Sequence, residues 1–101
     1  MLAHTAILPI FPKCVSSKEI ELDSSGTKKE ILSENVDRRS FCVLNASDSP
    51  VYISVTDEHP TWICKPNDYF QSPIPTYVGK LYAWSAEYKA KIVVTEFFVK
   101  E

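Results

Sequence analysis

The sequence predicts an all-β fold, in the form of a small antiparallel β-sandwich or jelly-roll-like barrel with an extended N-terminal arm. Apolar residues recur at every second position in most segments, which is the period of a half-buried strand. Turn-forming residues divide the chain into roughly six to eight short runs of this kind. No stretch shows the three-and-four spacing of an amphipathic helix. The 101 residues suffice for one domain of this type.

The N-terminal segment differs from the rest, so we divide the sequence into an arm (residues 1–17) and one sandwich domain (residues 18–101). Pro9 and Pro12 disfavour helix at the residues before them, which predicts an extended arm. This arm either forms the first strand of the core or leaves the domain and docks on a neighbouring subunit. Its large apolar side chains are candidates for a protein interface: Leu2, Ile7, Leu8, Ile10 and Phe11.

Two hairpins are predicted in the first half of the domain. Residues 19–22 alternate between polar and apolar and precede the turn formers at 23–26, so residues 27–33 are a candidate second arm. Residues 40–44 form a continuous apolar run, which suits a strand covered on both faces. Residues 51–56 alternate cleanly, and the turn formers between these two runs favour a second hairpin.

Prolines interrupt residues 57–75, where only two short strands are expected, at residues 61–64 and 69–72. The alternation returns at residues 80–85. Residues 91–99 are rich in β-branched and aromatic side chains and are the strongest strand candidate in the chain. We expect these last two strands to pair through a short hairpin connection.

The composition excludes several classes of function. Two glycines, Gly26 and Gly79, cannot supply a phosphate-binding loop. A net charge of −2 lacks the basic surface of a nucleic-acid binder. Three cysteines without a C-x-x-C pair argue against a disulfide framework and favour a reducing compartment. Neither a signal peptide nor a membrane span is expected. The sequence thus implies no cofactor, no nucleic acid and no membrane partner.

Catalytic and metal-binding residues are not indicated. His4 lies in the apolar arm, which is a poor environment for a general base. His59 follows Asp57 and Glu58, and Cys64 lies nearby in the sequence. Their spacing matches no standard pattern of metal ligands, so a solvated acidic loop is the preferred interpretation.

Aromatic residues make up 12% of the chain and are the best candidates for contact surfaces. Tyr52, Tyr82 and Trp84 share the same strand parity, which predicts a cluster on one sheet face. The aromatic candidates for a protein interface flank a proline-rich stretch and are Tyr69, Phe70 and Tyr77. A carbohydrate-binding surface would instead use Trp62, Tyr69 and Tyr77.

Arg38 and Arg39 are the only adjacent arginines and immediately precede a predicted strand. They are expected either to fix a turn or to contact an acidic partner, so both are interface candidates.

An ordered set of short motifs runs through the second and third quarters of the chain and into its last strand. It consists of Arg38-Arg39-Ser40-Phe41, Val43-Leu44-Asn45, Pro50-Val51-Tyr52-Ile53, Pro66 with Tyr69-Phe70, residues 77–84, and Ile92-Val93-Val94-Thr95-Glu96. This set resembles small virion structural proteins of tailed bacteriophages. Their pattern has an Arg leading a strand that ends in Asn, a Val-Tyr strand, a Pro-containing turn, a Gly before a Val-Tyr-Ala strand and a final Val-x-Val-x-Glu strand. The family's Pro-Gly turn is replaced here by Pro66-Asn67-Asp68, where Asn67 can take the positive φ of the glycine.

The resemblance covers residues 35–97 and implies a non-enzymatic virion component made in the bacterial host cytoplasm. Among such components, a capsid decoration or cement protein fits best. It would bind the major capsid protein or other virion proteins and form a homo-oligomer. A head–tail neck, tail or fibre-adaptor protein is the alternative within this class. A carbohydrate-binding β-sandwich is the alternative from another class.

Overall fold

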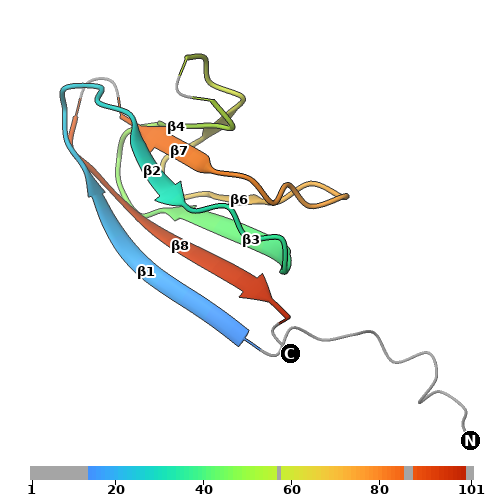
Figure 1. Cartoon of the computed structure of the whole chain (residues 1–101). Helices are drawn as coiled ribbons and strands as arrows, with labels where there is room; N and C mark the ends of the chain where they lie inside the picture. Colours follow the sequence, from blue (N-terminus) through green and yellow to red (C-terminus); the bar gives the residue numbers. More distant parts are fainter. Residues whose placement is uncertain (1–13, 57, 86–87, 100–101) are drawn as a thin grey trace, which may run out of the picture.

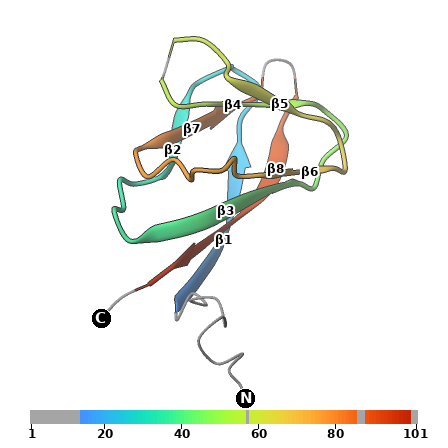
Figure 2. The ribbon, with the colours of Figure 1, turned by 90° about the vertical axis from the view of Figure 1, so that its right-hand side faces the viewer.

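The computed structural model describes residues 14–56, 58–85 and 88–99, and it contains two four-stranded antiparallel sheets packed face to face (Figures 1 and 2). The strands are β1 (Cys14–Leu22), β2 (Lys29–Leu32), β3 (Arg38–Asn45), β4 (Val51–Ser54), β5 (Trp62–Cys64), β6 (Tyr69–Gln71), β7 (Leu81–Trp84) and β8 (Ala90–Phe98). The predicted all-β sandwich is therefore confirmed. No helix in the described ranges is long and apolar enough to cross a membrane.

The first sheet has the strand order β1-β8-β3-β6 and contains the longest strands. β1 and β8 pair over nine residues, from Cys14 opposite Phe98 to Leu22 opposite Ala90, and form the long ribbon of Figure 1. β8 also pairs with β3, with a register irregularity between Arg38 and Ser40. The many β-branched residues of β8 explain its central position, because a strand between two neighbours is packed along its whole length.

The second sheet has the order β2-β7-β4-β5, and the hydrophobic core lies between it and the first sheet. In most strands alternate residues point into this core, as the two-residue period requires. In β2 the adjacent Ile31 and Leu32 are both buried, at a register irregularity between Glu30 and Leu32. The fully buried apolar side chains of the first sheet are Phe41, Val43, Ile92 and Val94. Those of the second sheet are Ile31, Val51, Ile53, Leu81 and Ala83.

The predicted hairpins are wrong, although the strands themselves are present. β1 pairs with β8 and β2 with β7, so residues 19–33 do not form a hairpin. β3 and β4 lie in opposite sheets, as do β7 and β8. Alternation fixes which side of a strand faces the core but carries no information about the partner strand. The resulting order, with most sequence neighbours in opposite sheets, is that of an eight-stranded double-sheet jelly roll.

Two tight turns use the left-handed backbone region. Gly26 has a φ of 79° in the turn between β1 and β2. Asn67 has a φ of 59° in the turn between β5 and β6, which confirms the expectation that Asn67 takes a positive φ. Asn tolerates this region better than most residues because its short polar side chain bonds locally.

Candidate functional site

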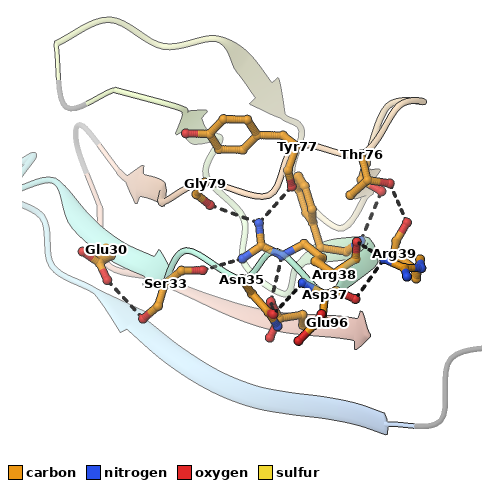
Figure 3. Close-up of polar contacts among 12 residues, drawn as sticks. Glu30, Ser33, Asn35, Asp37, Arg38, Arg39, Thr76, Tyr77, Gly79 and Glu96 are labelled. Atoms are coloured by element: carbon orange, nitrogen blue, oxygen red, sulfur yellow. Dashed lines mark hydrogen bonds and ion pairs between the residues drawn. The ribbon is translucent and has the colours of Figure 1, made fainter. Parts of the chain in front are cut away.

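The most elaborate polar cluster of the molecule surrounds Arg38, the first residue of β3. Its side chain is fully buried, and Figure 3 shows the guanidinium enclosed by groups from four segments. Nη1 donates to the carbonyl oxygens of Tyr77 (2.9 Å) and Gly79 (3.0 Å), and Nη2 donates to that of Ser33 (2.6 Å). The Phe41 ring lies 5.7 Å from the guanidinium carbon. Such a buried cation requires compensation of this extent.

Glu96 on β8 supplies the compensating negative charge. Nε of Arg38 donates to Oε2 of Glu96 at 2.7 Å, and the Glu96 side chain is only 13% exposed. Nδ2 of Asn35 donates to the same carboxylate oxygen at 3.2 Å. Oδ1 of Asn35 in turn accepts from the backbone N–H of Asp37 (3.0 Å), so the amide is fixed on both sides. The ion pair is therefore held inside a hydrogen-bonded network, the geometry in which buried pairs are stable.

Gly79 allows the chain before β7 to approach Arg38. A Cβ atom at this position would collide with the ring of Tyr77, which packs directly on the glycine. The absence of a side chain thus lets the carbonyls of residues 77 and 79 converge on one guanidinium nitrogen.

This cluster is a structural joint rather than a binding site. Four of the five N–H donors of Arg38 bond to protein groups, which leaves no pair of donors for a ligand. The joint connects β3 and β8 of the first sheet to the segments beside β2 and β7 of the second. The assignment of Arg38 to a contact surface is corrected accordingly, because the side chain is buried and saturated. Arg39 is exposed and remains a contact candidate.

Asn45 forms a second polar cluster at the other end of β3. Its side chain is fully buried, and Nδ2 donates to the carbonyls of Ser49, Cys64 and Lys65 at 2.8, 3.1 and 3.2 Å. Its Oδ1 accepts from the N–H and the hydroxyl of Ser47. The first and last residues of β3 are therefore both buried and polar. Each donates hydrogen bonds to backbone carbonyls of segments that adjoin the second sheet.

The aromatic interface candidates are separated by the fold. Tyr69 points to solvent and is 62% exposed. Phe70 is half-buried, with ring centroids 4.6 Å from Trp62 and 6.1 Å from Phe41. Tyr77 packs on the core beside Gly79. The three side chains proposed for sugar stacking, Trp62, Tyr69 and Tyr77, therefore do not share an exposed platform.

Sequence reasoning missed an apolar surface on the outside of the first sheet. We call it the outer apolar face, and it consists of Val15, Leu44, Tyr69, Val93 and Phe97. The strand registers place Val15 beside Phe97 in one cross-strand row. They place Val93, Leu44 and Tyr69 in another, in which Glu19 of β1 lies opposite Val93. Residues 92–98 place apolar side chains on both faces of the strand, although the core needs only one of them. This pattern is the signal that could have revealed the outer apolar face.

Uncharged polar residues occupy the row between those two. The Ser17 and Thr95 hydroxyls lie 3.1 Å apart, and Cys42 and Gln71 continue the row across β3 and β6. Burial raises the pKa of the Cys42 thiol. Beyond the row of Val93 and Glu19, Glu21 of β1 lies opposite Lys91 of β8, at the opposite end of the β1–β8 ribbon from Val15.

The outer side of the second sheet carries the predicted aromatic cluster. The rings of Tyr52 and Trp84 stack with centroids 5.8 Å apart, and Nζ of Lys28 lies 4.9 Å from the Trp84 ring. Trp84 is only 8% exposed as a result. The prediction is confirmed for Tyr52 and Trp84, and Tyr82 lies on the same side, opposite Ser54.

A hollow of about 760 Å³ lies where the β1–β2 turn meets the start of β8. Its charged lining residues are Glu21, Asp23, Lys28, Lys29, Lys89 and Lys91. Three of these lysines contact protein groups: Lys28 the Trp84 ring, Lys29 the Glu21 carbonyl and Lys91 the Glu19 carboxylate. Most of the positive charge is therefore already engaged.

The described ranges contain no group of three or more His, Cys, Asp or Glu side chains that could hold a metal ion. Cys64 is buried, and burial is the main cause that raises the pKa of its thiol. The arm candidates Leu2, Ile7, Leu8, Ile10 and Phe11 lie outside the described residues, whereas residues 14–17 form the first half of β1.

The comparisons with known proteins give no family. No protein-family model matches the chain, and searches of curated proteins and of solved structures return no match either.

Proposed function

We propose that the chain is a non-enzymatic structural protein of a tailed-phage virion, most specifically a decoration or cement protein that binds the capsid shell. The observation that carries this proposal is the role of the residues behind the resemblance. Arg38, Asn45 and Glu96 are the residues that build the two buried polar clusters. The residues of the motif therefore build the scaffold of the fold, in agreement with a resemblance whose motifs are structural rather than catalytic.

Two further features support a role in binding macromolecules. Double-sheet jelly rolls are frequent in viral capsid proteins, although they also occur in lectins, so the fold alone does not decide the function. The outer apolar face leaves Leu44 and Tyr69 exposed on a flat sheet surface, and exposed apolar patches mark contact surfaces. Each such contact contributes about 25 cal/mol per Å² of buried apolar area, and many copies on one shell add by avidity.

Cryo-electron microscopy of particles from the cells that produce this chain tests the proposal. A decoration protein should appear in hundreds of copies that follow the capsid lattice, with the jelly roll fitting the outer density. A few copies at one vertex would instead identify a neck, tail or fibre-adaptor protein. Absence of the chain from purified particles would overturn the proposal for the whole virion class.

A glycan array separates this proposal from the carbohydrate-binding alternative. The full chain should give no signal above that of an unrelated β-sandwich, because Trp62, Tyr69 and Tyr77 lie in separate environments. Saturable binding to one glycan class, reduced by Tyr69→Ala, would favour the alternative.

A further inference from the structure

The outer apolar face exposes three large apolar side chains to solvent. Val15 is 60% exposed, Leu44 41% and Tyr69 62%, and Val93 and Phe97 lie in the same cross-strand rows. The row between them contains only Ser, Thr, Cys and Gln side chains. Glu19 lies opposite Val93 at the β1 end of one row, and Glu21 pairs with Lys91 in the next row. The remainder of the face, from Val15 and Phe97 to Leu44 and Tyr69, carries no charged residue in these rows and suits an apolar, uncharged partner.

The chain contains a segment with this chemistry directly before β1. Residues 1–12 include no Asp, Glu, Lys or Arg, and His4 is their single ionisable side chain. Their large apolar side chains, Leu2, Ile7, Leu8, Ile10 and Phe11, match in kind those that line the face. A segment of this composition is not expected to remain in water.

Reach and direction favour the face of another copy. Twelve residues in extended conformation span about 40 Å, whereas the nine residues of β1 span about 30 Å, so the segment can cover a whole face. Cys14 is already paired with Phe98, and Pro12 disfavours the helical region for the residue before it. To cover the outer face of its own sheet, the segment would have to reverse direction immediately before β1, whereas the face of another copy requires no such reversal.

We infer that the outer apolar face receives residues 1–11 of a second copy of this chain, so that copies are joined by exchanged N-terminal segments. A reciprocal exchange gives a closed dimer, and an exchange in one direction gives a ring or chain of copies. The inference concerns contacts between copies alone. It stands or fails independently of whether the assembly binds a capsid, and purified protein suffices to test it.

The native Cys42 provides a direct test, because its side chain lies on this face between Thr95 and Gln71. In a full-length Cys14→Ser background, Ile7→Cys, Leu8→Cys and Ile10→Cys are made one at a time and oxidised with copper phenanthroline and oxygen. We expect at least one to give a disulfide-linked dimer on a non-reducing gel, and Cys42→Ser should abolish that dimer. An internal disulfide within one chain would overturn the exchange. Loss of cross-linking at all three positions would overturn docking on this face.

A mixing experiment tests the same contact without cross-linking. The full chain should be an oligomer by light scattering, and both Leu44→Lys and the double variant Ile7→Asp, Leu8→Asp should be monomers with the circular dichroism of the parent. A mixture of the two variants should recover a complex, because one supplies the segment and the other supplies the face. Ile63→Lys is the matched control, since Ile63 is 59% exposed on the second sheet and should leave the oligomer intact. A monomeric parent, or variants that stay oligomeric, would contradict the inference.

Discussion

The two outer faces of the sandwich use similar residue types in opposite ways. On the second sheet, Tyr52 and Trp84 stack on each other and Lys28 lies over the indole, so the aromatic surface is covered by the chain itself. On the first sheet, Leu44 and Tyr69 lie side by side in neighbouring strands and are 41% and 62% exposed. Apolar side chains on a sheet surface therefore do not define an interface by themselves. An apolar side chain is available to a partner only where no other side chain of the same chain packs over it.

The largest effect is expected from loss of the Arg38 joint, because both outer faces exist only while the two sheets remain packed together. Arg38→Leu leaves the Glu96 carboxylate and three backbone carbonyls without their donor inside the protein. We expect the free energy of unfolding in urea to fall by about 3–5 kcal/mol. Arg39→Leu, at the exposed neighbour, should change it by about 0.5 kcal/mol or less. Equal effects of the two substitutions would contradict the structural role of Arg38.

Truncation of one apolar residue on each face should destabilise the protein more at the buried Trp84 than at the exposed Leu44. Trp84→Ala removes a buried ring and should cost about 3 kcal/mol or more in thermal or urea unfolding. Leu44→Ala removes a side chain that is already 41% exposed and should cost about 1 kcal/mol or less. If Leu44→Ala destabilised an isolated chain as much as Trp84→Ala, the first face would be part of the core rather than an open surface.

Removal of the Lys28 cation from over the Trp84 ring should expose more of the aromatic surface of the second sheet to water. Lys28→Gln eliminates the contact with the indole and should cost about 0.5–1 kcal/mol, the usual size of an exposed cation–π pair. Tryptophan fluorescence should change as the ring gains water contact. Lys65→Gln, at an exposed position in the β5–β6 turn, serves as the control and should leave both readings unchanged.

The smallest effect is expected at the turn that connects the two sheets. Hydrogen bonds from the Ser25 hydroxyl and N–H lower the pKa of Asp23 below its usual 3.8. Since the folded pKa is lowered, the stabilisation by the charged form is complete above pH 3.8 and is lost as the pH falls through the lowered value. The stability difference between the parent and Asp23→Asn should therefore be present at neutral pH and vanish in acid. Ser25→Ala should reproduce this loss, and a pH-independent difference would refute the assignment.

The sequence predicted the strands well because each strand face is a local property. Residues 91–99 were expected as a strand and β8 covers 90–98. The positive φ of Asn67 was also predictable, since a turn imposes it within four residues. The pairing of β1 with β8 was not predictable, because it joins residues that are some seventy positions apart and no local pattern records the partner.

The nature of the candidate site was harder to predict. A charged residue such as Arg38 is expected at the surface, and its burial depends on carbonyls about forty positions away. A backbone carbonyl has no signature in the sequence. The outward orientation of Val93, which is half-buried, was hidden for a related reason. A continuous apolar run has the same pattern whether both faces of the strand are covered or only one is.

The Arg38 joint also has a consequence for the order of folding. Its partners Glu96, Gly79 and Tyr77 lie 58, 41 and 39 residues away along the chain. Closing loops of these lengths costs entropy before any of the hydrogen bonds forms, so the joint should assemble after the transition state. Substitutions at Arg38 should then accelerate unfolding far more than they slow refolding. The main effect of Arg38 is then expected to be on the lifetime of the native protein, because its side chain links the two sheets after they have packed together.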